Sequence, residues 1–157
     1  MSHLASSMAT LRVIGDDLDP DEVTTMLGCT PTFAQRQGQH IPTRSASFPE
    51  GFRVAKFGLW RLDATEAAPE NFDAQVAELV GKLTRELAVW RDTARRFRVE
   101  LFCGWFMKTS NDGVSISATS LRLLAERGIG LEVSIYDPTD DDPVKGEFAP
   151  LENPRGE

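Results

Sequence analysis

The densest group of side chains able to do chemistry is a run of five carboxylates in seven positions, Asp16, Asp17, Asp19, Asp21 and Glu22. Asp17, Asp19 and Asp21 match the first three ligand positions of a calcium-binding loop. The rest of such a loop fails, because Glu22 replaces its glycine, Pro20 interrupts it, and Gly28 stands where a bidentate glutamate is needed. The spacing instead predicts an N-cap at Asp19, with Glu22 completing a capping box. Asp16 and Asp17 are left without a structural role.

Imidazole and thiol groups are scarce. His3 and His40 are the only histidines, and Cys29 and Cys103 stand far apart. Their spacing does not predict zinc binding. Cys103 falls on an apolar strand face, and Cys29 follows a helix C-terminus, where the dipole disfavours a thiolate. Nucleophile-elbow, phosphate-loop and dinucleotide motifs are absent. We therefore expect no catalytic residue, no cofactor site and no metal site.

Charge and hydropathy restrict the partners. The net charge is −7, from 17 basic and 24 acidic residues, which disfavours nucleic acid and permits a basic protein partner. The arginines at 91, 95, 96 and 98 are a candidate RNA- or phosphate-binding cluster, but we favour the alternative that they complement the negative end of a helix dipole. No apolar stretch approaches the ~20 residues of a membrane span, and no signal peptide is visible. With only two cysteines, a cytoplasmic protein is expected.

Aromatic residues suggest one surface. Trp60 and Trp105 fit core or sheet-face positions, although Trp60 also remains a candidate for a partner or ligand surface. Phe102 and Phe106 lie on the nominally polar face of their strand. Either a helix covers that face, or an exposed apolar patch serves a partner or an oligomer.

The elements that position these groups alternate between strands and helices. Apolar spacing predicts strands near residues 11–15, 52–62, 97–107 and 129–136, and helices from 19, over 72–90 and from 117. A slip in the apolar phase of the second strand suggests a β-bulge at Gly58. The long central helix carries one apolar stripe, with Asp73 and Gln75 assigned to its opposite face and a cap at Asn71. The segment 29–51 is a long loop of the kind that is often functional.

A helix start occurs twice, at Leu18-Asp19 and at Ile116-Ser117, each an N-cap inside a hydrophobic staple. The chain therefore predicts two β-α-β halves around a central helix. Strands with one apolar face favour an α+β fold, with a mostly antiparallel sheet of four to six strands and helices packed on one face, as in a ferredoxin-like sandwich. We expect a flexible leader over residues 1–9, a single domain over 10–137, and an acidic, Pro-rich tail over 138–157.

One motif string resembles a known family. It comprises Leu18 to Thr24, Leu27-Gly28, Pro31-Thr32, Gly38, Gly58-Leu59-Trp60, and Leu121 to Tyr136. Together these pieces resemble the bacterial domain-of-unknown-function family 4279 over roughly residues 10–137. The resemblance implies a shared fold and a bacterial origin, and it carries no catalytic residue.

Three functions follow as hypotheses. The favoured one is a non-enzymatic protein-binding module, of the kind that neutralises a toxin as an immunity protein, because the chain is small and acidic and lacks a catalytic constellation. The second is a small-ligand-binding or enzymatic domain using the 29–51 loop, with His40, Asp16 and Asp17 as its polar groups. The third is a structural homodimer that self-associates through Phe102 and Phe106.

Overall fold

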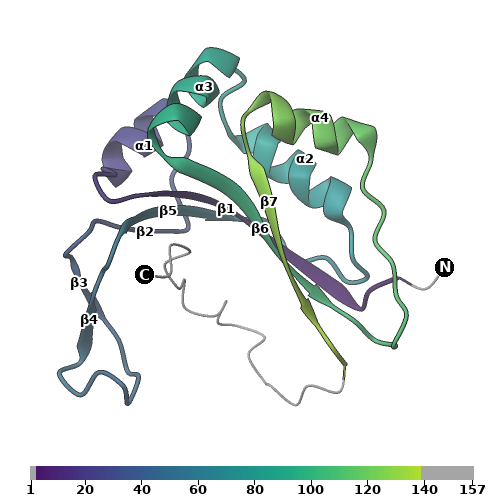
Figure 1. Cartoon of the computed structure of the whole chain (residues 1–157), viewed down its shortest axis with the longest axis horizontal. Coiled ribbons are helices and arrows are strands. Elements are labelled where there is room, and N and C mark those ends of the chain that lie inside the picture. The colour runs from purple at the N-terminus through teal and green to yellow at the C-terminus, as the bar shows by residue number, and fades with distance from the viewer. Residues whose placement is uncertain (1–2, 139–157) are drawn as a thin grey trace.

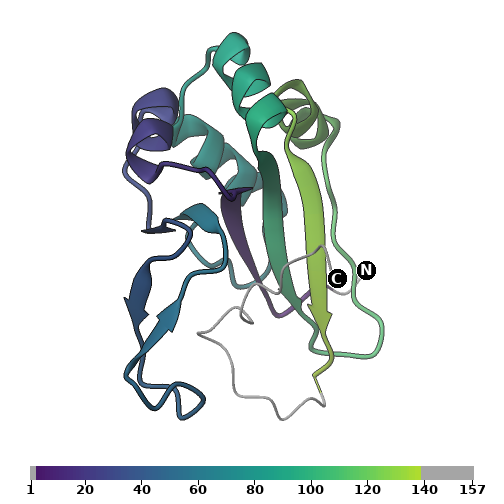
Figure 2. The ribbon, with the colours of Figure 1, turned by 60° about the vertical axis from the view of Figure 1, so that its left-hand side comes forward.

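The computed structural model describes residues 3–138. The helices within these residues all lie on one face of a five-stranded sheet, and none of them covers the opposite face (Figures 1 and 2). A separate two-stranded sheet projects beside it. The expected α+β class, with helices on one face, is confirmed.

The seven strands are β1 (Ser6–Gly15), β2 (Phe33–Gln35), β3 (His40–Pro42), β4 (Phe52–Val54), β5 (Gly58–Asp63), β6 (Arg98–Phe106) and β7 (Gly130–Tyr136). The four helices are α1 (Pro20–Leu27), α2 (Phe72–Lys82), α3 (Leu87–Arg96) and α4 (Ala118–Glu126). These elements belong to the described part of the chain.

The main sheet has the order β2-β5-β1-β6-β7. β1 is central and runs antiparallel to both β5 and β6, β2 is antiparallel to β5, and β7 is parallel to β6. The sheet is therefore mixed, with three antiparallel strand pairs and one parallel pair. Two β-α-β units with parallel strands are present. In β6-α4-β7 the two strands are neighbours in the sheet, whereas in β1-α1-β2 they are separated by β5.

The first strand begins inside the segment that we expected to be a flexible leader. β1 starts at Ser6, and Leu4 is buried. The small polar residues there resemble a loop in sequence, but the segment is held by the sheet: the Ala5 N–H donates to the Phe106 carbonyl at 2.9 Å. The Ser7 hydroxyl donates to Gln75 Oε1 at 2.9 Å. Gln75, which we assigned to solvent, is consequently buried.

The predicted central helix is two helices. The chain becomes extended at Leu83, with φ −110° and ψ 164°, before α3 begins. Contacts outside the helix explain the break, because the Thr84 N–H donates to the Leu27 carbonyl at the end of α1, at 2.9 Å. The Trp90 Nε1–H then donates to the Thr84 carbonyl at 2.8 Å. The apolar stripe still faces the core, but it is shared between two helices.

The predicted strand over 52–62 is also two strands. β4 pairs with β3 in the projecting hairpin, whereas β5 joins the main sheet at Gly58. Gly58 is not a bulge. A Cβ atom there would lie 2.5 Å from the Gly15 carbonyl oxygen and 2.8 Å from Leu18 Cβ, so glycine allows β5 to approach β1. The 29–51 segment contributes β2 and β3.

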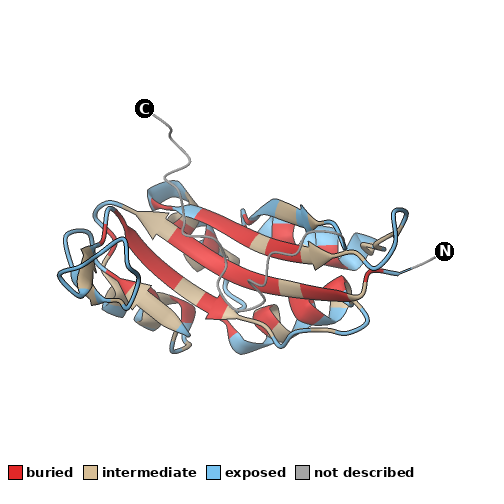
Figure 3. Cartoon of the chain, turned by 90° about the horizontal axis from the view of Figure 1, so that it is seen from below, coloured by how far each residue is buried: buried red, intermediate tan, exposed pale blue. Residues whose placement is uncertain are grey.

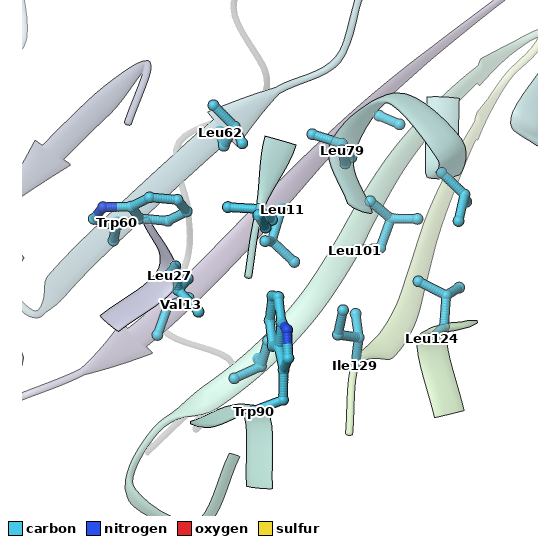
Figure 4. Close-up of a cluster of buried hydrophobic side chains, with 14 of the residues drawn as sticks. Leu11, Val13, Leu27, Trp60, Leu62, Leu79, Trp90, Leu101, Leu124 and Ile129 are labelled. Atoms are coloured by element: carbon cyan, nitrogen blue, oxygen red, sulfur yellow. The ribbon is translucent and has the colours of Figure 1, made fainter. Parts of the chain in front are cut away.

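The core lies between the helices and the sheet. Figure 4 shows Leu11, Val13, Trp60, Trp90 and Leu101 meeting there. The predicted caps at Asp19, Asn71 and Ser117 each accept a hydrogen bond from their own helix.

Two apolar residues of the predicted elements are exposed. Leu121 on α4 is 52% exposed, because the inward position belongs to Ser120, whose hydroxyl donates to the Asp73 carboxylate. Ile135 is 62% exposed because β7 lies at the edge of the sheet, beyond the cover of the helices.

Candidate binding surface

One face of the main sheet carries none of the described helices and has no assigned structural role. We call it the open face; it comprises Phe33, Gln35, the odd residues 59–63, and the even residues 6–14, 98–106 and 130–136. Their neighbours in sequence, such as Leu11 and Leu101, point into the core. Figure 3 shows this face without a described helix in front of it, and colours many residues of its strands as buried.

A buried ion pair lies at the centre of the open face. Arg12 on β1 is hydrogen-bonded to the Glu100 carboxylate on β6, and both residues are buried. Arg98 Nη2 donates to Glu100 at 2.6 Å, and the Arg12 guanidinium lies 4.3 Å from the ring centroid of Phe102. Burial lowers the pKa of Arg12, and Glu100 opposes that effect. An arginine remains charged under these conditions, so the pair is ionic.

A second arginine lies beside the first. Arg61 on β5 is directly opposite Arg12 in the register. Like charges in a cross-strand pair repel each other, so each needs a carboxylate nearby. Arg61 Nε lies 3.2 Å from Asp63 Oδ1, and its guanidinium lies over the ring of Phe33. The open face thus carries two stacks of an arginine on an aromatic ring, and a neighbouring carboxylate balances the charge of each arginine.

Three buried polar atoms on the open face lack a hydrogen-bond partner within residues 3–138. They are Ser6 Oγ, Arg12 Nε and Arg61 Nε, the last being close to Asp63 but not aligned with it. A buried donor without an acceptor costs about 1–3 kcal/mol.

Phe102 and Phe106, predicted to form a patch, both lie on the open face and are half-buried. Phe102 lies under Arg12, while the Phe106 ring stacks on Tyr136 of β7 with centroids 4.7 Å apart. The structure therefore brings these two predicted residues to one surface.

The other predicted surface residues do not join them. Trp60 is fully buried, and its Nε1–H donates to Thr24 Oγ1 at 3.1 Å, so it belongs to the core and is corrected as a surface candidate. His40 is exposed on β3, where it stacks on Phe52 with centroids 4.4 Å apart. Asp16 and Asp17 are exposed in the turn before α1. Among the described residues, no hydrogen bond or ion pair links His40 to either aspartate.

The acidic run is largely structural. Asp19 caps α1 by accepting from the Asp21 N–H at 2.9 Å, and Arg36 lies 2.8 Å from Asp19. Glu22 does not complete the predicted capping box, since its carboxylate pairs with Arg96 at 2.5 Å. The hydrogen bond from Arg36 lowers the pKa of Asp19, and that from Arg96 lowers the pKa of Glu22.

Sequence reasoning missed Arg12, Arg61, Glu100 and Tyr136. Alternation was the available signal for Arg12, because the polar Thr10 and Arg12 alternate with apolar residues at 9, 11 and 13. Only the apolar half of that pattern was used in predicting the first strand.

Other chemistry receives little support. Burial raises the pKa of the Cys103 thiol to about 12, so it is not an activated nucleophile. Across residues 3–138, no three His, Cys, Asp or Glu side chains are grouped so that they could hold a metal ion. None of the helices described is long and apolar enough to cross a membrane.

These features define a class of small α+β protein, in which helices cover one face of a mixed sheet and an arginine-aromatic surface occupies the other. The chain belongs to the family described as Domain of unknown function (DUF4279), whose sequence profile matches residues 5–138, as the resemblance predicted. No curated protein and no solved structure matches the chain.

Proposed function

We propose that this protein is a non-enzymatic protein-binding module of the bacterial cytoplasm, and that its partner docks on the open face. The observation that carries the proposal is the composition of that face. Arginine and aromatic side chains are enriched in the cores of protein interfaces and dominate their binding energy. Here they occur as stacked pairs held rigidly on a sheet, which limits the conformational entropy lost on binding.

The chemistry of the open face suggests how a partner is held. Phe102, Phe106 and Tyr136 offer half-buried apolar area for contact. A protein segment with apolar or aromatic side chains could pack against this area.

Net charge acts at longer range. Residues 139–157 hold six acidic and two basic residues, so they supply −4 of the total −7. Charges on the open face itself are mostly paired. Attraction to a basic partner, such as a toxin neutralised by an immunity protein, would therefore speed the encounter more than it would strengthen the docked contact.

The split unit β1-α1-β2 also supports a ferredoxin-like relationship, which we keep as a proposal about fold.

Affinity capture with matched variants tests the proposed function. The full chain is used as bait in lysate of the bacterium that encodes it, beside Phe106→Ala on the open face and Leu121→Ala on α4, where an exposed leucine provides an apolar control. A partner retained by wild type and Leu121→Ala but lost by Phe106→Ala supports the proposal. Equal recovery by all three baits, or recovery of no partner, contradicts it.

Light scattering on the same variants addresses the alternative of a homodimer through Phe102 and Phe106. If Phe106→Ala alone converts a dimer into a monomer, the open face binds a second copy of this chain, and the proposal of a different protein partner is wrong.

A further inference from the structure

Within the described residues, strand β7 leaves one side of its backbone unpaired. There its only neighbour is β6, and the Met107 N–H donates to the Tyr136 carbonyl at 3.0 Å. Because successive residues of a strand direct their N–H and C=O groups to opposite sides, those of Leu131, Val133 and Ile135 point away from β6. None of these three residues has a backbone hydrogen bond on that side within residues 3–138.

The exposed edge is also apolar. Leu131 is 40% exposed and Ile135 is 62% exposed. Proteins protect free edges with lysine, proline, a bulge or a very short strand. The opposite edge strand, β2, has only three residues, whereas β7 has seven and contains no lysine, proline or bulge. Its one charged residue, Glu132, lies on the open face.

The sequence of β7 fits a second copy of itself. Antiparallel pairing about a two-fold axis at Val133 places Leu131 opposite Ile135 of the other copy, twice by symmetry. Gly130 then faces Tyr136, an arrangement in which an aromatic ring covers an edge glycine. Glu132 faces Ser134, so no like charges are directly opposed. The three outward residues of each copy would form six backbone hydrogen bonds.

We propose that the chain forms a dimer through antiparallel pairing of β7 with β7 of a second copy. The two five-stranded sheets become one continuous sheet of ten strands. Because the two-fold axis is perpendicular to the sheet, both open faces lie on the same side, giving a bivalent binding surface. This contact is distinct from the open face and does not depend on the proposed function.

The chain's own C-terminal segment is a poorer occupant of the edge. Residues 139–157 include prolines at 143, 150 and 154 and three consecutive aspartates. Proline cannot donate to a strand ladder, and aspartate is depleted in strands.

Analytical ultracentrifugation of the full chain over a range of concentrations tests the dimer. Ile135→Lys adds a charge at an already exposed position, so the monomer should fold normally, which far-ultraviolet circular dichroism checks. We expect the dissociation constant to rise about tenfold or more, because both symmetry-related apolar pairs are lost. The matched control, Leu121→Lys on α4, should leave association unchanged.

A charge pair tests the register. In the double variant L131E/I135K, each introduced carboxylate faces an introduced ammonium group across the axis, so association should recover relative to Ile135→Lys alone. A wild-type monomer at every concentration overturns the proposal. So does a dimer that tolerates Ile135→Lys, or one that L131E/I135K fails to restore.

Discussion

Asp73 provides the sharpest test of how the two halves of the fold are joined. Its carboxylate, at the start of α2, accepts hydrogen bonds from the Ser117 N–H at 3.1 Å, the Ser117 hydroxyl at 3.0 Å and the Ser120 hydroxyl at 2.5 Å. These bonds fix the first turn of α4 against α2. Ser120 is 3% exposed, so water cannot readily replace the lost acceptor.

Asp73→Ala should lower the free energy of unfolding by about 2–3 kcal/mol, the cost of leaving buried donors unsatisfied. Urea denaturation monitored by tryptophan fluorescence measures this change. Asp92→Ala is the control, because Asp92 is an exposed helical carboxylate that pairs with Arg95 on the surface. Its loss should stay below about 0.5 kcal/mol. Equal losses for the two variants would refute the bridging role of Asp73.

The same contact predicts a pH dependence. The Ser120 hydrogen bond, helped by Ser117 and opposed by burial, holds the pKa of Asp73 below its ordinary value. Because the pKa of Asp73 is lower in the folded protein than in the unfolded chain, where it is about 3.9, the ionised carboxylate stabilises the fold at pH values above about 3.9. This stabilisation is lost as the pH falls through the pKa of the folded state. The difference in unfolding free energy between wild type and Asp73→Asn should therefore be largest near neutral pH, and it should shrink as the pH falls below about 3.9. A difference that stays constant on acidification would contradict this reasoning.

Two further predictions concern packing and thiol chemistry. Gly58→Ala should destabilise the protein by several kcal/mol, since the new Cβ would lie 2.5 Å from a backbone oxygen. Gly81→Ala, at a helical position with open space around it, should stabilise the protein by about 0.5–1 kcal/mol. Thermal unfolding measures both changes, and equal effects would contradict the close approach of β1 and β5. With a thiol reagent at neutral pH, half-buried Cys29 should react in the native state, while Cys103, buried and with its pKa raised to about 12, should react only after unfolding. Rapid native reaction of both thiols would be inconsistent with the core position of Cys103.

Local signals predicted the helix starts and the face of the sheet that the helices cover. Asp19, Asn71 and Ser117 cap as expected, because capping depends only on residues within one turn. Phe102 and Phe106 were placed on the polar face by alternation alone. The structure confirms that placement.

Long-range contacts explain what the sequence did not reveal. The break at Leu83 depends on Thr84 reaching Leu27, which is distant in the chain. Strand β1 begins early because β6 is long enough to pair with Ser6. The inward turn of Ser120 depends on Asp73 of another helix. In each case a contact between distant segments of the chain overrides the local sequence pattern.

The candidate surface was only partly predictable for the same reason. Arg12 and Arg61 become neighbours only when β1 and β5 pair, and the carboxylate of Glu100 comes from a third strand. Trp60 was misjudged as a surface candidate because its burial depends on α1, whose Thr24 accepts the indole N–H.

Hydrogen-exchange footprinting of the complex with the captured partner tests the central claim most directly. The claim predicts slower exchange in the strands that carry the open face, strongest around Phe102 and Phe106 on β6 and in the neighbouring segments of β1 and β5. Exchange in α1 to α4 should be unchanged. Protection confined to the helices, with β1, β5 and β6 exchanging as in the free protein, would show that the partner does not bind the open face.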